Sequence, residues 1–262
     1  MVKSEKQKSD EKLNIERGNL VVKRNDLIQK AHHHLSLQEQ KIVLFLISKI
    51  KPNDTEFTEQ EFYIAEYCKF CGMDETSGKN YSGVKDAIGK LLSRFVWIKR
   101  DNGSITSLRW IDKATINEGS GLVQLKFDKD LKPYLLFLEE RYTLYEMRYT
   151  LAMRSQYSIR LYELLKSYEF KKNVYIEIEE LKRLMSAENH KINNNFKRRV
   201  LEIAVREINE YTDISVTYNF HKEGRRFSNV LFGIDKKEAF ERFKAGTKIN
   251  EMLDEKKKAG GY

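Results

Sequence analysis

Residues 193–209 are the segment that most constrains how this chain can fold. At about 100° per residue, the apolar side chains of the segment share one broad arc of a helix. That arc contains Phe196, Val200, Leu201, Ile203, Ala204, Val205 and Ile208. The opposite arc is polar and basic, and it contains Asn195, Arg198, Arg199, Glu202, Arg206 and Asn209. The segment therefore predicts an amphipathic helix whose outer face is cationic and bears amides.

Two strand patterns joined by a basic turn follow this helix. Apolar residues alternate over residues 214–220, a second strand pattern covers residues 227–234, and the turn contains Lys222, Arg225 and Arg226. A basic helix followed by a hairpin with a basic tip is the sequence form of a winged helix. Arginine and asparagine read guanine and adenine edges in the major groove, so the unit indicates nucleic-acid binding. An ordinary solvated helix is the alternative interpretation of the basic helix alone.

The order helix, strand, helix, helix, hairpin occurs twice. In the first half, Ser36 and Glu39 predict a capping box at the start of a buried helix, and an Asn-Gly turn joins two hairpin strands. The other predicted elements are a strand at 57–64, helices at 65–73 and 81–95, hairpin strands at 96–100 and 105–111, a strand at 122–127 and a helix at 131–138. The second half repeats the order from Ser155. We therefore predict an α+β fold of two tandem winged-helix domains.

Four parts are expected along the chain: a flexible N-terminal arm (1–18), a first winged-helix domain (19–140), a second one (141–235) and a charged C-terminal tail (236–262). The arm carries charges of both signs, and so does the tail, as most solvated runs do. Near the junction of the domains, Tyr142, Tyr145 and Tyr149 have the spacing of one helix face. Packing in the core or at an interface is their expected role.

The two halves differ in the charge of the helix that precedes the hairpin. In the first half the predicted outward residues are small and nearly neutral, whereas the second half presents three arginines. We predict that the second domain makes most base contacts and that the first contributes phosphate contacts, which give affinity and register. The candidate DNA-binding residues of the second domain are Arg154, Ser155, Asn194, Asn195, Lys197, Arg198, Arg199, Glu202, Arg206, Lys222, Arg225 and Arg226. Those of the first domain are Lys79, Lys90, Lys99 and Arg100.

Two of these assignments have a structural alternative. Arg154 and Ser155 open a helix, whose free N–H groups can bind a phosphate, although helix capping alone would also explain Ser155. Glu202 could accept a hydrogen bond from a cytosine amine. It could equally pair within the helix with Arg198 or Arg206, four residues away on either side, and this pairing is the favoured interpretation.

Composition narrows the class of protein. The 262 residues carry a formal net charge of +9, which favours polyanionic partners. No apolar run is long enough for a membrane helix, and the N-terminus has no apolar core of a signal peptide, so we expect a cytoplasmic protein. Neither a P-loop nor a dinucleotide-binding pattern occurs, and no cofactor is expected.

Two cysteines and three adjacent histidines are the candidate metal ligands in the sequence. Cys68 and Cys71 form a Cys-x-x-Cys pair, but no second pair completes a zinc site, and buried reduced thiols are expected. His32, His33 and His34 are adjacent, and three adjacent side chains cannot all face one metal. No carboxylate partner is patterned nearby, so we expect a turn before Ser36 and no metal.

The pattern resembles the initiator proteins of theta-replicating, iteron-containing plasmids. The resemblance covers roughly residues 20–235, and its most specific run is Ser-x-Tyr-x-x-Arg-Leu-Tyr-Glu at 155–163. The other matching stretches are 25–28 with 35–41, 81–97 and 196–214. The resemblance implies two winged-helix domains and no enzymatic activity. The weakly basic outer face of the first domain departs from the family, so we expect that domain to contact chiefly the DNA backbone.

The resemblance also implies partners. Monomers would bind repeated origin sites (iterons), promote melting of nearby DNA, and recruit the host replication initiator and the replicative helicase. Dimers, formed mainly through the first domain, would bind an inverted repeat at the gene's own promoter, repress it and limit copy number. The runner-up function is a winged-helix transcriptional regulator without an initiation role. A nickase would need a metal-binding histidine pair and a tyrosine nucleophile, a pattern that the sequence does not show.

Overall fold

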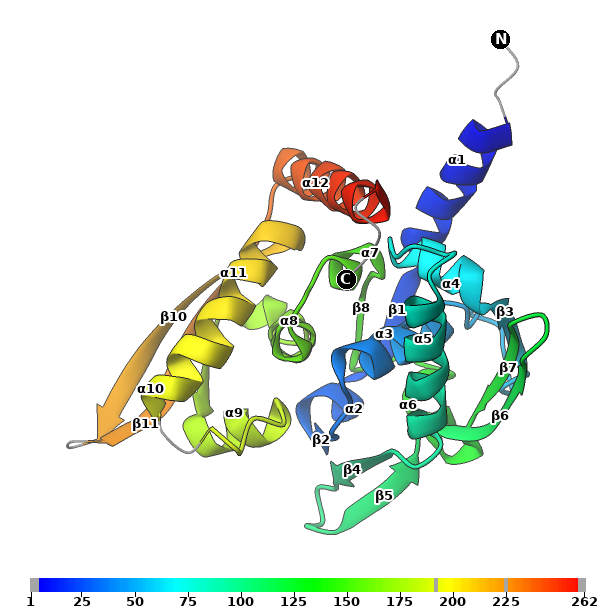
Figure 1. Ribbon diagram of the computed structural model, residues 1–262. Coiled ribbons are helices and arrows are strands. Elements are labelled where there is room, and N and C mark those ends of the chain that lie inside the picture. The colour runs from blue at the N-terminus through cyan, green and yellow to red at the C-terminus, as the bar shows by residue number, and fades with distance from the viewer. Residues whose placement is uncertain (1–4, 191–192, 224–225, 259–262) are drawn as a thin grey trace.

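The computed structural model describes residues 5–190, 193–223 and 226–258. It contains two winged-helix domains that lie side by side, with the first domain on the right and the second on the left in Figure 1. The predicted α+β fold of two tandem winged-helix domains is therefore confirmed. Among the described residues, no helix is long and apolar enough to span a membrane.

The first half of the chain contains most of the short elements. Its helices are α1 (Glu5–Arg17), α2 (Asn25–Gln29), α3 (Leu37–Ile47), α4 (Ile64–Phe70), α5 (Gly78–Leu91), α6 (Lys132–Leu135) and α7 (Arg148–Leu151). Its strands are β1 (Leu20–Arg24), β2 (Ala31–His32), β3 (Gln60–Tyr63), β4 (Phe95–Lys99), β5 (Ile105–Arg109), β6 (Ile111–Asn117), β7 (Leu122–Phe127) and β8 (Tyr142–Glu146).

The second half contains one long helical run and one long hairpin. Its helices are α8 (Gln156–Lys166), α9 (Ile178–Leu184), α10 (Asn193–Phe196), α11 (Glu202–Tyr211) and α12 (Ala239–Lys258). Its strands are β9 (Asn173–Glu177), β10 (Ile214–Glu223) and β11 (Arg226–Lys236). A π-helical turn over Lys197–Leu201 joins α10 to α11.

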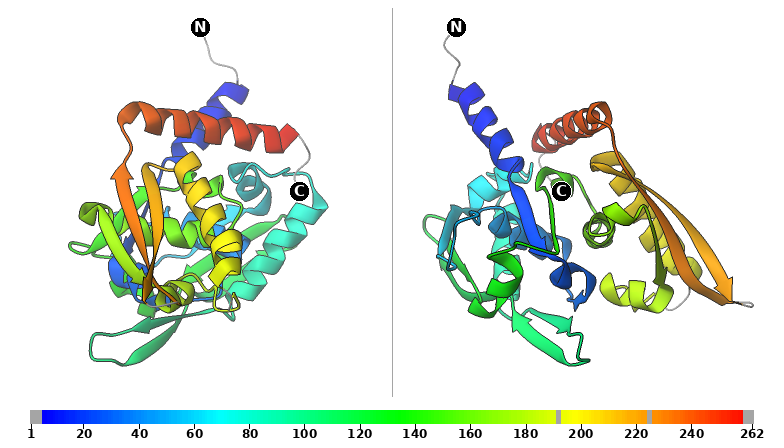
Figure 2. Two further views of the ribbon diagram at one scale, coloured as in Figure 1. Left: turned by 90° about the vertical axis from the view of Figure 1, so that its left-hand side faces the viewer. Right: turned by 180° about the vertical axis from the view of Figure 1, so that it is seen from behind.

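In the second domain, the hairpin forms a three-stranded sheet in the order β10-β11-β9. Helix α11 packs against α8 and against β10 (Figure 2). The apolar arc predicted for residues 193–209 faces this core, where Phe196, Val200, Leu201, Ala204 and Ile208 are fully buried. Burial of this arc is what holds the basic face outward.

In the first domain, α3, α4 and α5 are followed by the hairpin β4–β5, to which β2 adds a third strand. The predicted capping box starts α3: the backbone N–H of Ser36 donates to the Glu39 carboxylate, and the Glu39 N–H donates to the Ser36 hydroxyl. Helix α5 begins earlier than predicted because Ser77 caps it through the Asn80 N–H. The Asn-Gly turn of the hairpin is present, and Gly103 adopts a φ of +82° there.

A second sheet of the first domain was not predicted. Strand β6 pairs with β7, which pairs with β3. The sequence prediction ended the hairpin's return strand at Ile111, and it left residues 112–117 unassigned. This strand was missed because most of its side chains after Ile111 are exposed or half-buried, so it lacks the apolar alternation that reveals a strand.

The prediction that three tyrosines share a helix face is wrong. Tyr142 and Tyr145 lie on strand β8, which pairs with β1, and only Tyr149 is helical. Tyr142 is exposed, whereas Tyr145 is buried with its ring centroid 5.1 Å from that of Tyr162. The expected packing role holds for Tyr145 and Tyr149. The spacing was misleading because strand pairing with β1 overrides helical periodicity here.

The described parts of both terminal segments are helical, which the sequence analysis did not predict. Arg17 at the end of α1 is buried, and its guanidinium donates to the carbonyls of Phe70 and Lys69. In α12, residues Ala245, Ile249 and Leu253 recur every four positions and are buried. These buried contacts stabilise the two helices against the rest of the protein. The charged composition of the two segments did not predict them.

The two domains meet through a buried polar network. The Glu163 carboxylate of α8 forms an ion pair with Lys23 of β1 at 2.5 Å and accepts from the Tyr145 hydroxyl at 2.5 Å. Arg160 of α8 donates to the carbonyl of Ala31 at 3.2 Å. Helix α8 thus contacts α2 and α3 as well as α11. The boundary between residues 140 and 141 stays a prediction.

Candidate nucleic-acid interface

The outer face of the helical run 193–211 is exposed as predicted. Its exposed members are Asn194, Asn195, Arg198, Arg199, Glu202, Arg206 and Asn209, and Lys197 is half-buried beside them. No ion pair links Glu202 to Arg198 or Arg206 in the described part of the chain, so the favoured intrahelical pairing is not present. The carboxylate and the guanidinium groups of this face remain available to a ligand.

A π-helical turn lies in the middle of this face. It covers Lys197–Leu201 and so includes Arg198 and Arg199. A π turn holds one residue more than an α turn, and such turns frequently occur at functional sites. The extra residue changes the direction in which side chains before and after the turn project. The π turn therefore shifts the projection of the basic side chains relative to an unbroken α-helix.

Asn209 lies on the exposed face, but its side-chain amide is bonded to the hairpin. Its side-chain amide donates to the carbonyl of Val216 at 2.9 Å and accepts from the Val216 N–H at 2.6 Å. This paired contact joins the end of α11 to strand β10. Asn209 is exposed on the outer arc, as predicted, but its side-chain amide is already bonded to the backbone of β10.

The backbone N–H groups of Arg154 and Ser155, just before α8, already have a partner. The N–H groups of Arg154 and Ser155 donate to the carboxylate of Glu207 at 3.2 and 3.3 Å, and the Ser155 hydroxyl caps the N–H of Tyr157. Glu207 was assigned no role by the sequence, although it is buried. The premise of a phosphate site on these N–H groups is wrong, because a buried carboxylate already occupies them. Side-chain contacts of Arg154 and Ser155 with DNA stay a prediction.

The tip of the second hairpin is basic and aromatic. Strand β10 shifts register between His221 and Lys222, a bulge that increases local twist. The Lys222 ammonium lies over the Phe227 ring, 4.9 Å from its centroid. Arg225 lies outside the described residues, and so does the side chain of Arg226. Of the predicted tip residues, the structure therefore places only Lys222 in full.

The predicted cations of the first domain are exposed. Lys79 and Lys90 lie on α5, and Lys99 and Arg100 lie at the tip of the β4–β5 hairpin. Lys85, which the sequence prediction omitted, is also on α5 and forms an ion pair with Glu118. Helices α5 and α11 both lie toward the viewer in Figure 1 and toward the right in the left view of Figure 2. The two helices can therefore face one extended ligand.

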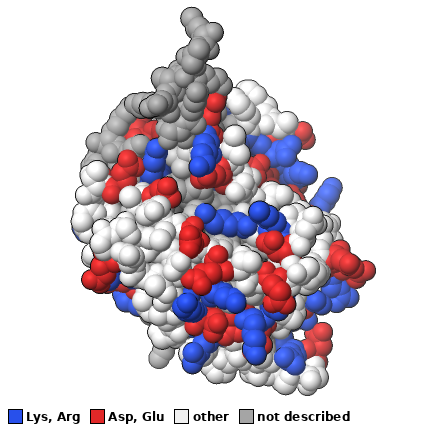
Figure 3. All heavy atoms as spheres, turned by 90° about the vertical axis from the view of Figure 1, so that its right-hand side faces the viewer, with Lys and Arg blue, Asp and Glu red and all other residues white. Residues whose placement is uncertain are grey.

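The side of the first domain that is turned away from the second has a different character. There, lysines and arginines are interspersed with aspartates and glutamates (Figure 3). A polyanion favours a face of one sign, so this mixed face is a poor candidate for DNA contact. The candidate interface is thus the α5 and α10–α11 side.

Comparisons with known proteins bear directly on this assignment. A family model described as "Initiator Replication protein, WH1" matches residues 20–166, which is more than half of the chain. A second model, "Initiator Rep protein, WH2", matches residues 177–234. The chain belongs to the initiator replication protein family. This Rep protein therefore has both winged-helix domains of the family, and the resemblance inferred from the sequence is confirmed.

Individual relatives agree with the family. The Rep protein is 26% identical to a replication initiation protein of Escherichia coli over 227 residues, covering 82% of this chain and 70% of the relative. It is 33% identical to the Escherichia coli PI protein over 144 residues, covering 48% of this chain and 46% of that one. A crystal structure of a Pi initiator protein in complex with iteron DNA superposes with a TM-score of 0.71. That match covers 85% of this chain and 99% of the other at 22% identity, and it shows that the fold is shared.

Proposed function

We propose that this Rep protein is a sequence-specific DNA-binding initiator of plasmid replication that binds iteron repeats at its origin. The exposed face of α10–α11, with its arginines and asparagines held outward by a buried apolar arc, is the observation that carries the proposal. The relative whose fold it shares was crystallised with iteron DNA, which supports the choice of ligand. Family membership favours a binding protein over an enzyme.

The proposal assigns separate roles to the two domains. Asn194, Asn195, Arg198, Arg199 and Arg206 on the second domain are the candidates for reading bases, because these side-chain types match base edges. Lys222 and the other wing cations, with Lys79, Lys90, Lys99 and Arg100 of the first domain, would contact phosphates. Such contacts give affinity that falls with salt, with a slope of roughly −0.9 per neutralised phosphate.

Membership of the initiator family supports two finer expectations. Bound monomers would promote origin opening and recruit the host replication initiator and helicase. A dimer formed through the first domain would repress the gene's own promoter. A transcriptional regulator that binds only its operator is the alternative function, and it would use the same recognition helix.

Footprinting of the DNA that flanks the gene distinguishes the two functions. An initiator should protect directly repeated sites at a fixed spacing, and permanganate should detect unpaired thymines in an adjacent segment of a supercoiled plasmid. A plain regulator should protect one inverted repeat and give no unpaired thymines. If the protein protects no specific sequence in the presence of random competitor DNA, both functions are refuted.

Substitution of Arg206 by alanine tests the recognition face. If Arg206 reads a guanine, Arg206→Ala should weaken binding to the specific site by about 1–3 kcal/mol and leave binding to a random duplex nearly unchanged. Equal losses on both duplexes would make Arg206 a phosphate contact instead. Arg242→Ala, which removes the same charge from the exposed surface of α12, is the matched control and should change neither affinity by a comparable amount.

A further inference from the structure

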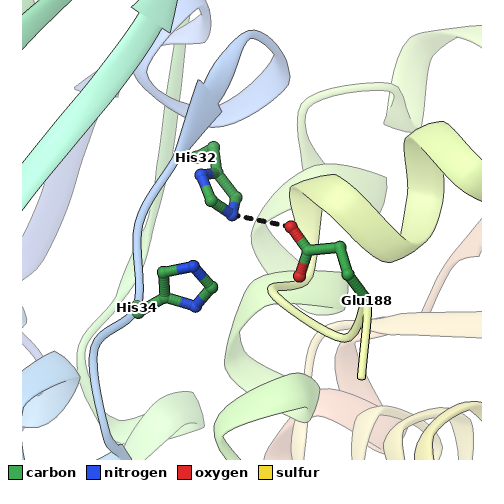
Figure 4. Close-up of side chains that lie close together, drawn as sticks. All are labelled: His32, His34 and Glu188. Atoms are coloured by element: carbon green, nitrogen blue, oxygen red, sulfur yellow. Dashed lines mark ion pairs between the residues drawn. The ribbon is translucent and has the colours of Figure 1, made fainter. Parts of the chain in front are cut away.

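Three side chains that can ligate a metal ion meet where the two domains touch. His32 ends β2, His34 follows two residues later, and Glu188 lies in the loop after α9 (Figure 4). One ligand atom from each side chain can be chosen so that all three lie within 4.8 Å of one another. We propose that His32, His34 and Glu188 form a Zn²⁺ site that joins the first winged-helix domain to the second.

The local backbone explains why only two of the three adjacent histidines take part. Side chains alternate between the two sides of an extended segment. His33 points into the first domain, where its ring packs edge-on against Trp110 with the centroids 5.4 Å apart. His32 and His34 therefore share the opposite side, and their ring centroids lie 4.6 Å apart. Adjacency in the sequence argued against a metal, whereas alternation places two ligands together.

The carboxylate comes from the other domain, which sequence spacing could not reveal. Glu188 Oε1 lies 2.8 Å from His32 Nε2, and His32 Nε2 is buried. The neighbouring Arg183 guanidinium donates to both carboxylate oxygens of Glu180, at 2.7 and 2.6 Å. Arg183 thus has a partner of its own, and the Glu188 carboxylate faces the histidines.

Bonds that do not involve the ligands hold the two segments in place. Arg160 donates to the carbonyl of Ala31, next to His32, and to the carbonyl of Leu184 at the end of α9. The Ser186 hydroxyl donates to the carbonyl of His33. A site of this kind needs its ligand-bearing backbone fixed by surrounding contacts. Here the hydrogen bonds of Arg160 and Ser186 fix both the histidine segment and the segment that follows α9.

The donor set selects the class of ion. Imidazole nitrogens suit Zn²⁺ and its neighbours in the transition series, whereas Mg²⁺ and Ca²⁺ prefer oxygen ligands. Zn²⁺ binds nitrogen and carboxylate oxygen at about 2.0–2.2 Å, which places tetrahedral ligands roughly 3.3 Å from one another. Rotation of the exposed His34 and Glu188 side chains would close the site to that spacing. Three protein ligands leave a fourth position for water.

The test is calorimetric titration of ZnCl₂ into the chelator-treated, untagged full-length protein, with thermal unfolding as a second readout. The wild type should bind one Zn²⁺ and its melting temperature should rise with added Zn²⁺. His34→Ala and Glu188→Gln should each weaken this binding at least about 10-fold and abolish the shift in melting temperature, because each removes a direct ligand. Both side chains are exposed, so both variants should melt like the wild type without metal.

His221→Ala is the matched control, since it removes an exposed histidine from the second wing and should leave Zn²⁺ binding unchanged. Wild-type protein that binds no Zn²⁺ stoichiometrically would overturn the proposal. Binding that is equally tight in His34→Ala and Glu188→Gln would also overturn it and would place the ion elsewhere, for example at Cys68 and Cys71. If His34→Ala alone lowers the metal-free melting temperature, His34→Asn replaces it in the same comparison.

Discussion

The carboxylate of Glu207 occupies the position that a phosphate would need at the start of α8. It accepts from the N–H groups of Arg154 and Ser155 at the N-terminal end of α8, where the helix dipole favours negative charge. This carboxylate is part of the fold, so it takes the place of an external ligand. A bound DNA phosphate at this point would meet like charge.

We predict that Glu207→Gln lowers the free energy of unfolding by about 1–3 kcal/mol, because charge-assisted hydrogen bonds to two backbone donors are lost in a buried place. Urea unfolding of the two proteins measures the difference. The control is Glu210→Gln on the same helix, which removes a partly exposed ion pair with Lys248 and should cost less than about 1 kcal/mol. Equal losses in both variants would contradict the role assigned to Glu207.

Both cysteines are buried thiols that form no disulfide, as the sequence predicted. Burial, and then the nearby Cys71, raises the pKa of the Cys68 thiol to about 12. At pH 8 its thiolate fraction is then roughly 10⁻⁴, compared with about a quarter for an ordinary thiol of pKa 8.5. We predict that iodoacetamide labels Cys68 at pH 8 at least about 100-fold more slowly in the native protein than in urea. Mass spectrometry of timed samples checks this, and rapid native labelling would refute it.

The sequence predicted which side chains of the site are exposed, but it could not predict their contacts with residues distant in the chain. The outer arginines and asparagines of α10–α11 were predicted from local spacing alone, and their exposure followed. Asn209 and Glu207 lie on the same helical run, yet each is committed to a backbone partner that only the tertiary fold brings near. Glu188 likewise meets His32 from the other domain.

At the scale of elements, α5 contains glycines that no packing contact requires. A Cβ added at Gly83 would meet nothing within 4 Å. Glycine inside a helix costs roughly 0.5–1 kcal/mol relative to alanine. Packing within the domain does not offset this loss of stability. The missing side chains do, however, let another backbone approach the outer face of α5 closely.

We predict that Gly83→Ala raises the free energy of unfolding by about 0.5–1 kcal/mol, since it restores helix propensity without a clash. Urea unfolding gives this value. If α5 approaches the DNA backbone, the same variant should bind the origin site more weakly while being more stable. A variant that binds as tightly as the wild type would exclude close approach at this position.

Elements with strong periodicity were predicted well, and those fixed by pairing were not. The capping box of α3 and strand β7 are present where the sequence placed them. Strand β6 has few apolar side chains and is held by its pairing with β7, so its amino-acid sequence gives little indication of a strand. Strand β8 pairs with β1, which lies more than a hundred residues earlier in the chain. Local sequence patterns could not reveal a pairing between such distant segments.

For the molecule as a whole, the second domain is attached to the first at both of its ends. Helix α8 enters it through the buried network of Lys23, Glu163 and Arg160. At the other end, α12 packs on α7 and returns to the first domain, where Leu253 lies so close to Gly72 that a Cβ there would be 2.8 Å from the Leu253 carbonyl oxygen. Two separate attachments restrict rotation of one domain against the other.

This double attachment bears on how the two recognition helices would act as a pair. When α11 has engaged its part of a DNA site, α5 is already held near the adjoining part, and its contact becomes an intramolecular event. The effective concentration of the second module is then set by the rigid junction instead of by a loose linker. Weak contacts from the nearly neutral α5 can therefore add to avidity, and site spacing becomes a strict requirement because a rigid pair cannot stretch.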